Sequence, residues 1–430
     1  MTMKNRKQSK RPTVKKVYFN MKVALVHDYL KENGGAERVL KVLTEIYPKA
    51  PIYTAFSVKG STAEKLFRGA EIHESWLAPI LKIKSLYSPL RFLIPWIWGS
   101  FDLSDYDLVI TSASWYITRG FKTGKEDLPA GRQTKVICYC HTPPRWLYGY
   151  DTSVNFQKYW PVKIYAVIVG HFLRMYDFNV SQKINYWIAN SKNVAERIWK
   201  FYRKKSVVIY PPVDTKNIIK YCHAEFSSAS EILKRVQDDR IVSKPYFLIV
   251  SRIVGAKGIE NAIRAFQSKS MSKYKLKIVG ESHGYSNIEY ELRGSSGGNT
   301  RLQASGAPVT GGQVEFLGRV DDKKLWELYA KAKGFVALAK EEDFGMTVVE
   351  AQAAGCPVIA YNGGGFKESV ISGVTGLLIN NTDEKTLKNA IEQFNKIKWD
   401  KNKIMENAKR FSKERFEKEL RIYIKKINAY

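Results

Sequence analysis

Two acidic residues eight positions apart mark the segment of the chain best suited to chemistry. The segment runs from Gly334 to Ala360 and reads GFVALAKEEDFGMTVVEAQAAGCPVIA. Its apolar start predicts a buried parallel strand, and the apolar spacing over 347–354 predicts a helix that ends at Gly355. Glu342 then lies on the loop between them and Glu350 about one turn into the helix, so both can point into one crevice. The alternative is a cap-region charge and a solvated helix face.

Two cations follow another predicted strand. The run 246–250 is apolar, Arg252 and Lys257 lie on the loop after it, and Gly258 stands at the start of a predicted helix. Two cations and the free N–H groups of a helix N-terminus can hold a diphosphate without a metal ion. Two solvent-facing cations in a very basic protein are the alternative.

Two loops in the first half of the chain also follow predicted strands. Gly34 and Gly35 come between the first strand and a helix, where glycine lets the polar groups of a ligand approach backbone amides. The strand predicted over 135–139 places His141 just past its carboxyl end. Arg145 follows four residues later and is a candidate to bind a phosphate or an anionic acceptor.

The combined pattern resembles the donor-site signature of retaining glycosyltransferases of family 4. The signature is E-x7-E with an embedded FG, followed by EA-x-A-x-G-x-PVIA. HDYLKENGGAERVL, CHTPPR, the R-x4-KG spacing and a P-x-V-D junction extend the resemblance over 21–430, apart from apparent insertions near 124–133, 220–243 and 294–312. The resemblance implies the GT-B fold, in which two Rossmann-like α/β domains face each other across a cleft.

The resemblance also implies a role for each of these residues. His141 and Glu342 are the predicted catalytic residues: His141 lies beside the transferred sugar, and Glu342 holds its hydroxyls. Glu350 accepts hydrogen bonds from the ribose, and Arg145 meets the acceptor. The full implied donor-binding set is Gly34, Gly35, Arg252, Lys257, Phe344, Gly345, Met346 and Glu350. No metal and no other cofactor is expected, because the two cations and the helix amides near Gly345 would stabilise the departing diphosphate.

The implied reaction moves a hexosyl group from a nucleotide-diphosphate sugar to a lipid-linked or polysaccharide acceptor, with retention of configuration. The HDYL, GGAER and CHTPPR motifs favour transfer of a mannosyl group. GDP-mannose is therefore the expected donor, and a UDP-sugar is the alternative. Two alternatives are a non-enzymatic protein that binds polyanions or nucleic acid, and another GT-B enzyme such as an epimerase or a phosphorylase. No nucleic-acid partner is expected, because the basic residues are spread along the chain without a recognisable reading motif.

Length and composition predict the domain organisation. A chain of 430 residues is too long for one ordinary core, and 44% hydrophobic residues indicate a globular protein. We expect a disordered basic tail over 1–20, with Met21 as an alternative start of the protein. A first domain over 21–210 and a second over 211–395 should follow, with helices over 396–430 that pack back on the first domain.

The charge and two apolar segments bear on the location of the protein. The net charge of +29 predicts attraction to polyanions, an anionic membrane surface among them. The segment 74–101 mixes three tryptophans with three cations and fits a bilayer interface and a packed helical pair equally well. For 159–175, a position in the core is favoured.

The chain contains no run of about 18 uncharged apolar residues, and its four cysteines show no metal-ligand spacing. We therefore expect a cytoplasmic protein, peripheral at most on the inner face of the membrane.

Overall fold

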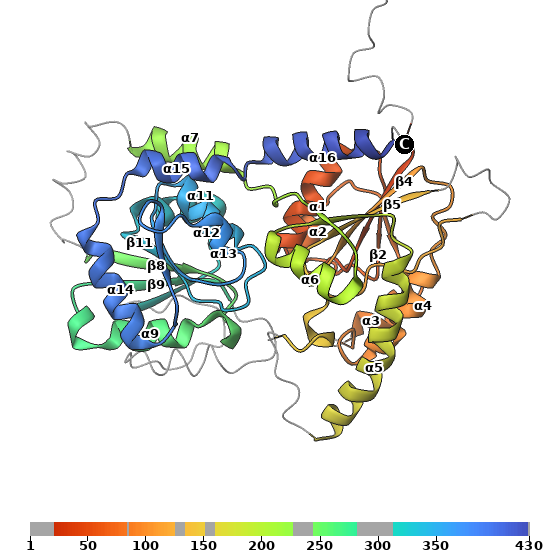
Figure 1. The fold of residues 1–430 in the computed structure, drawn as a ribbon, viewed down its shortest axis with the longest axis horizontal. Helices are drawn as coiled ribbons and strands as arrows, with labels where there is room; N and C mark the ends of the chain where they lie inside the picture. Colours follow the sequence, from red (N-terminus) through yellow and green to blue (C-terminus); the bar gives the residue numbers. More distant parts are fainter. Residues whose placement is uncertain are drawn as a thin grey trace, which may run out of the picture.

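The computed structural model describes residues 21–83, 86–124, 134–150, 160–226, 244–281 and 313–428. These residues form two α/β domains, each built on a parallel sheet with helices packed against it (Figure 1). The predicted tail over 1–20 and most of the three apparent insertions lie outside the described residues.

The first domain contains a seven-stranded sheet in the order β3-β2-β1-β4-β5-β6-β7. Its strands are β1 (Val23–His27), β2 (Ile52–Thr54), β3 (Ile72–Glu74), β4 (Leu108–Ala113), β5 (Lys135–Cys140), β6 (Tyr186–Ala189) and β7 (Val207–Val208). Its helices are α1 (Gly35–Ile46), α2 (Thr62–Leu66), α3 (Ala78–Leu81), α4 (Ile94–Gly99), α5 (Trp160–Gln182) and α6 (Lys192–Tyr202). All residues of β1 and β4 are buried, as expected for apolar strands covered on both faces.

The second domain contains a six-stranded sheet in the order β10-β9-β8-β11-β12-β13. Its strands are β8 (Tyr246–Val250), β9 (Lys275–Val279), β10 (Val314–Gly318), β11 (Gly334–Ala337), β12 (Val358–Tyr361) and β13 (Gly376–Ile379). The helices from this half of the chain are α7 (Thr215–Phe226), α9 (Ile259–Gln267), α11 (Asp322–Lys331), α12 (Met346–Ala353), α13 (Phe366–Ser369), α14 (Glu384–Lys396), α15 (Lys401–Lys409) and α16 (Lys413–Asn428).

Three helices, α14, α15 and α16, follow β13 in the described part of the chain. The side chain of Asp383 caps α14, and that of Asp400 caps α15 by accepting from the amides of Asn402 and Lys403. Each cap starts a separate helix. Helix α16 returns to the first domain, where Phe416 and Leu420 are buried in one hydrophobic cluster with residues of α1 and β1 (Figure 1).

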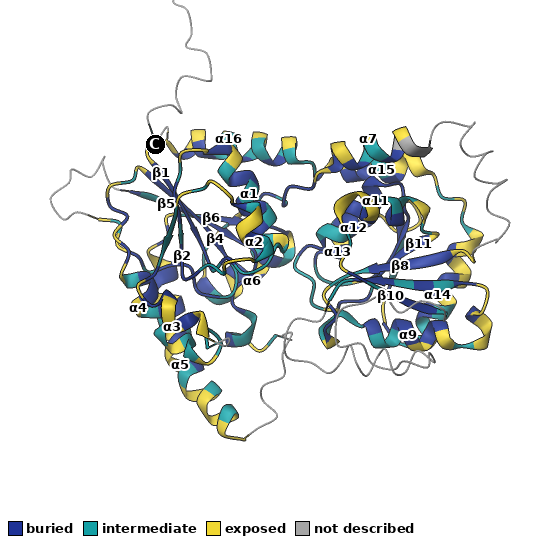
Figure 2. Ribbon diagram, turned by 180° about the vertical axis from the view of Figure 1, so that it is seen from behind, coloured by how far each residue is buried: buried dark blue, intermediate teal, exposed yellow. Residues whose placement is uncertain are grey.

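Helix α5 contradicts the prediction that 159–175 belongs to the core. Its first turns project beyond the first domain and are largely exposed (Figure 2). Trp160 is 73% exposed, Val167 67% and Phe172 65%. The segment 74–101 agrees in part with each of its two predictions. Trp98 is fully buried, as in a packed helical pair, while Trp96 is 59% exposed, as at a bilayer interface. Among the described residues, no helix is both long and apolar enough to span a membrane.

The second half of α5 is held on the sheet by a buried ion pair. The guanidinium of Arg119 contacts the carboxylate of Asp177, and both side chains are almost fully buried. The hydroxyl groups of Tyr202 and Tyr148 donate to the same carboxylate at 2.7 and 2.8 Å. The Arg119 guanidinium also lies 5.4 Å from the ring centre of Trp187, whose fluorescence can therefore report on this region.

Replacing Asp177 with alanine should strongly destabilise the first domain, because it leaves the buried Arg119 charge without a partner. We expect the free energy of unfolding to fall by about 3–5 kcal/mol, measured by urea titration with tryptophan fluorescence. Glu406→Gln removes an exposed ion pair with Lys409 and should change it by less than about 0.5 kcal/mol. Equal effects of the two substitutions would contradict this assignment.

Candidate functional site

A cleft with a volume of about 610 Å³ lies between the two domains. Its walls are loops at the carboxyl ends of β1, β4 and β5 on one side and of β8, β9 and β11 on the other. Parallel sheets place these loops along a single edge, which is where open α/β proteins bind ligands. The predicted site residues that line the cleft are Gly34, Gly35, His141, Arg252, Lys257, Glu342, Phe344, Gly345 and Met346.

Glu342 and Lys257 meet on the second-domain wall. The Lys257 Nζ atom lies 2.5 Å from Glu342 Oε2. Burial would raise the pKa of Glu342, but Lys257, Arg145 and Arg252 bring it below its ordinary value, so the carboxylate stays ionised. Lys257 owes its place to Gly258, which has a φ of +68°. A Cβ atom there would lie only 2.9 Å from Leu338 Cβ, so the turn requires glycine.

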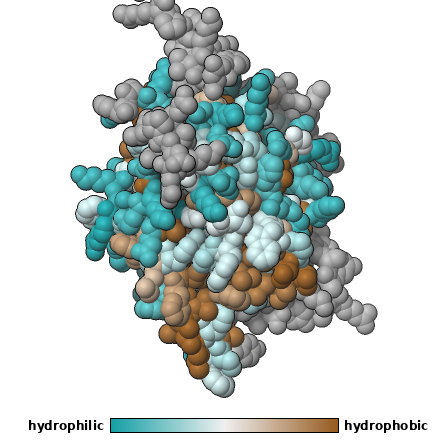
Figure 3. Space-filling model, turned by 90° about the vertical axis from the view of Figure 1, so that its right-hand side faces the viewer, coloured by the Kyte–Doolittle hydropathy of each residue, from teal (hydrophilic) through white to brown (hydrophobic). Residues whose placement is uncertain are grey.

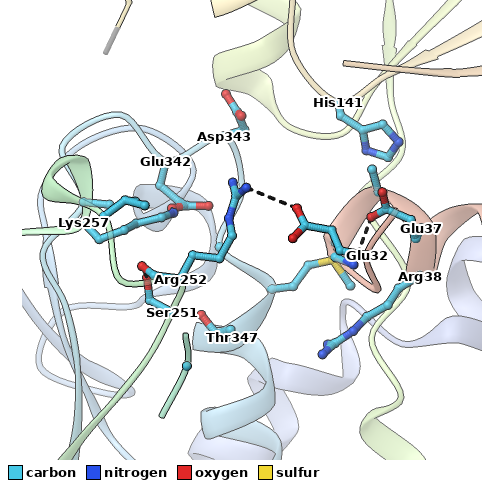
Figure 4. A pocket seen from close by; sticks show the side chains of 18 of the residues that line it. Glu32, Glu37, Arg38, His141, Ser251, Arg252, Lys257, Glu342, Asp343 and Thr347 are labelled. Atoms are coloured by element: carbon cyan, nitrogen blue, oxygen red, sulfur yellow. Dashed lines mark hydrogen bonds and ion pairs between the residues drawn. The ribbon is translucent and has the colours of Figure 1, made fainter. Parts of the chain in front are cut away.

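Arg252 and the start of α12 complete this wall. Arg252 reaches across the cleft, with its Nη1 atom 3.4 Å from Glu32 Oε1 of the first domain (Figure 4). The N-cap of α12 is Gly345, which has no side chain to satisfy the first N–H groups of the helix. Gly345 has a φ of +86°, and a Cβ there would come within 2.5 Å of the Phe366 ring. Cations and free amides therefore surround Glu342, an arrangement suited to an anionic ligand.

Glu350 does not line the cleft, so the two acids predicted to share one crevice are separated. It is 5% exposed and forms an ion pair with Arg38 of α1, and the Tyr329 hydroxyl group donates to it at 3.2 Å. Because Glu350 is the fifth residue of α12, its side chain contacts α11 rather than the loop that carries Glu342. Its contact with a ribose stays a prediction.

Arg145 also lies outside the cleft lining and pairs with the loop that follows β11. Its Nη2 atom is 2.7 Å from Asp343 Oδ2, and Arg197 Nη1 is 2.8 Å from Asp343 Oδ1. Arg197 binds Glu341 as well, at 2.5 Å. These three ion pairs join the two domains. Arg197 and Asp343 could not be predicted as partners from the sequence, because nothing in either local pattern indicates a partner in the other domain.

A chain of polar contacts connects His141 to the interior of the first domain. Ser112 Oγ lies 2.8 Å from His141 Nε2 and 3.1 Å from His27 Nδ1. His27 Nε2 is 3.6 Å from Glu37 Oε1. Burial lowers the pKa of His141 to about 3, with a contribution from His27, so the His141 ring is neutral at physiological pH. Burial acts the same way on His27, but Glu37 and Asp28 outweigh it and raise its pKa.

Among the described residues, no group of three or more His, Cys, Asp or Glu side chains could hold a metal ion.

Comparisons with known proteins agree with this architecture. Residues 33–217 match the model described as Glycosyltransferase Family 4, and 233–411 match the one described as Glycosyl transferases group 1. The crystal structure of Anabaena HepE in complex with UDP and glucose superposes with a TM-score of 0.62 at 19% identity, over 94% of this chain and 99% of HepE. The chain has the GT-B fold of glycosyltransferases.

The curated relatives match this chain at low identity and over different lengths. The alpha-1,3/1,6-mannosyltransferase ALG2 of Candida albicans is 26% identical over 89% of both chains. An uncharacterised 41.2 kDa protein of the cps region of Klebsiella pneumoniae is 26% identical over 44% of this chain, and the match spans about half of that relative, 47%.

The neutral state of His141 predicts a specific pH dependence of stability. The unfolded chain binds a proton at this histidine below pH about 6.5, whereas the folded protein does not until pH about 3. His141 therefore reduces stability as the pH falls through this window, by about 2 kcal/mol at pH 5. His27 acts oppositely, since the stability from its raised pKa is present below pH about 6.5 and lost as the pH rises through the folded value.

We therefore expect His141→Gln to lose less thermal stability than wild type between pH 7.5 and pH 5. The readout is the difference between the two melting midpoints, which cancels any effect that is the same at both pH values. His73→Gln is the control, because the His73 side chain is 42% exposed. An unchanged difference for His141→Gln would mean that this histidine is charged in the folded protein.

Proposed function

We propose that this protein is a retaining glycosyltransferase that moves a hexosyl group from a nucleotide-diphosphate sugar to an acceptor hydroxyl. The observation that carries this proposal is the arrangement of Arg252, Lys257 and the α12 N-terminus around Glu342 on one wall of the cleft. Both domains match glycosyltransferase models, and HepE, which shares the fold, is described in complex with UDP and glucose.

The donor site follows from where charge develops during transfer. When the sugar–phosphate bond breaks, negative charge collects on the departing diphosphate, and Arg252, Lys257 and the α12 amides can stabilise it. Lys257 and Glu342 contact each other at 2.5 Å. A donor that enters between them would give its phosphate to Lys257 and its sugar hydroxyls to Glu342, since a carboxylate accepts from two donors of a diol.

Retention is proposed to proceed on one face of the sugar, without a covalent intermediate. The ionised Glu342 is held by Lys257 and lies in the field of Arg145 and Arg252, which reduces its strength as a nucleophile. The leaving phosphate then helps to take the proton of the acceptor hydroxyl. The neutral ring of His141 can contact the sugar from the other wall without adding a charge.

GDP-mannose is the proposed donor, with a UDP-sugar as the second choice. The Candida relative that matches 89% of this chain is named a mannosyltransferase, whereas the HepE complex contains UDP. No metal ion is assigned to the donor site, because the cations on its wall can neutralise a diphosphate.

A lipid-linked acceptor at the inner face of the membrane is proposed in preference to a polysaccharide. Support comes from exposed apolar side chains that gather around α5 and the α3–α4 region, which we call the apolar surface (Figure 3). It comprises Trp76, Ile80, Ile83, Phe92, Trp96, Trp160, Ile164, Val167, Ile168, Phe172 and Met175. Aromatic and aliphatic groups of this kind are typical of elements that lie in a membrane interface.

Nucleotides should stabilise the protein selectively. We expect GDP and GDP-mannose to raise the melting midpoint more than UDP, ADP or their sugars, and EDTA to leave the shift unchanged. A ligand at 100 times its Kd adds about 2.7 kcal/mol to the folded state. Lys257→Gln should lose most of the shift. A selective response to UDP would mean that the donor carries uracil instead of guanine. If no nucleotide raised the melting midpoint, the result would contradict the donor site.

Glu342→Gln should separate donor binding from catalysis. The amide keeps the shape of the side chain but loses the charge that meets Lys257 and the sugar hydroxyls. We expect donor hydrolysis, measured as release of nucleoside diphosphate, to fall by roughly 100-fold or more, while the nucleotide-induced thermal shift is kept. Glu341→Gln alters the neighbouring residue, which pairs with Arg197, and should cost less than about tenfold. Equal turnover of Glu342→Gln and wild type would rule out the assigned role.

A further inference from the structure

Two cations at the first-domain side of the cleft have no acidic partner within the part of the chain that the structure describes. They are Lys31, after β1, and Arg91, on the 3-10 helix η2 (Pro89–Leu93). Of the other cations that line the cleft, Arg38, Arg252 and Lys257 each pair with a carboxylate, and Arg319 is exposed. Lys31 and Arg91 are half-buried, so their lack of a counter-ion needs an explanation.

Aromatic rings hold both cations in place. The Lys31 Nζ atom donates to the Tyr87 hydroxyl at 3.3 Å, and the Arg91 guanidinium lies 4.7 Å from the centre of the Trp146 ring. Tyr87 packs at 5.5 Å against Tyr29, and its carbonyl accepts a hydrogen bond from the buried Tyr116. Cation–π contacts fix the position of a charge but leave its hydrogen-bonding groups available.

The acids that line this side of the cleft, Asp28, Glu32 and Glu37, are already engaged elsewhere, and Glu32 contacts Arg252. The carboxylate of Asp28 accepts from the amides of Ser114 and Trp115 at 3.0 and 2.6 Å. Glu37 accepts from the Gly34 amide at 3.0 Å. Burial lowers the pKa of Arg91, and the groups that oppose this shift are tyrosines rather than carboxylates. A bound anion would compensate this desolvated charge.

Both cations line the cleft, and Arg91 is next in sequence to a residue of the apolar surface. Phe92, next to Arg91, is 40% exposed and belongs to that surface. The hydroxyl group of Tyr165, on α5, donates to the Pro89 carbonyl and so joins α5 to η2. The sequence contains no acidic residue over 75–101 or over 160–176. A ligand with an anionic group in the cleft and an apolar part outside it matches this combination of charge and hydrophobicity.

We propose that Lys31 and Arg91 bind the phosphate of a lipid-linked acceptor, whose lipid chain stays in the bilayer against the apolar surface. This inference rests on the proposed function, because it names the acceptor of that transfer. The acceptor phosphate and the donor diphosphate then have separate pairs of cations, Lys31 and Arg91 on the first domain and Arg252 and Lys257 on the second. Since Glu32, the neighbour of Lys31, contacts Arg252, the two anion sites adjoin.

The test is co-sedimentation of the full chain with phosphatidylcholine vesicles that carry a polyprenyl phosphate. Vesicles with the same negative charge from phosphatidylglycerol are the reference. We expect wild type to bind the polyprenyl phosphate vesicles at least tenfold more tightly. Lys31→Gln/Arg91→Gln should abolish this preference, and Lys31→Arg/Arg91→Lys should recover part of it. The melting midpoint of each variant checks that it is folded.

Arg252→Gln/Lys257→Gln is the matched control and should keep the preference, because it changes two cations in the other domain. A preference lost in this control would place the phosphate in the donor site and overturn the proposal. Equal binding to both kinds of vesicle, or to neither, would also overturn it. The measurement needs no donor and no turnover, so a protein that fails the nucleotide screen can still pass this test.

Discussion

The acidic loop after β11 makes ion pairs to both domains, and the cleft depends on them. Glu341 and Asp343 bind Arg197 and Arg145 of the first domain, whereas Glu342 between them binds Lys257 of its own domain. Glu341 and Asp343 therefore face the first domain, while Glu342 between them faces its own domain. The same three residues thus fix the distance between the sheets and place one carboxylate where a ligand would lie. Since the side chain of Arg197 is only 6% exposed, its ion pairs are less screened than those on the surface.

Much of the fold could be predicted because local signals agree with the tertiary structure. The strand predicted over 246–250 matches the bounds of β8, and the helix predicted after Gly258 begins at Ile259. Buried parallel strands read as short apolar runs, and glycines mark the turns into helices. The GT-B arrangement was predicted from the resemblance to a glycosyltransferase family, and the two parallel sheets agree with it.

The errors have a common physical origin in contacts between distant parts of the chain. The sequence of an apolar helix has the same pattern whether the helix packs in the protein core or exposes its apolar side chains. The exposure of α5 could therefore not be predicted. Glu350 is placed by a cation 312 positions away, and no local pattern encodes such a pair. The contacts of Ser112 could not be predicted either, because they are made with two histidines, His27 and His141, that lie on or just after neighbouring strands.

The single hydroxyl of Ser112 gives the row of polar groups behind His141 a direction. Glu37 favours the charged form of His27. When His27 is charged, its Nδ1 atom donates to Ser112 Oγ, and the serine proton then points to Nε2 of His141. The neutral ring of His141 then carries its own hydrogen on Nδ1 and offers a donor there rather than a lone pair. When His27 loses its proton, its Nδ1 atom can accept from the Ser112 hydroxyl, which then accepts from Nε2 of His141 instead. The protonation of His27 beside Glu37 therefore decides which tautomer His141 presents to the cleft.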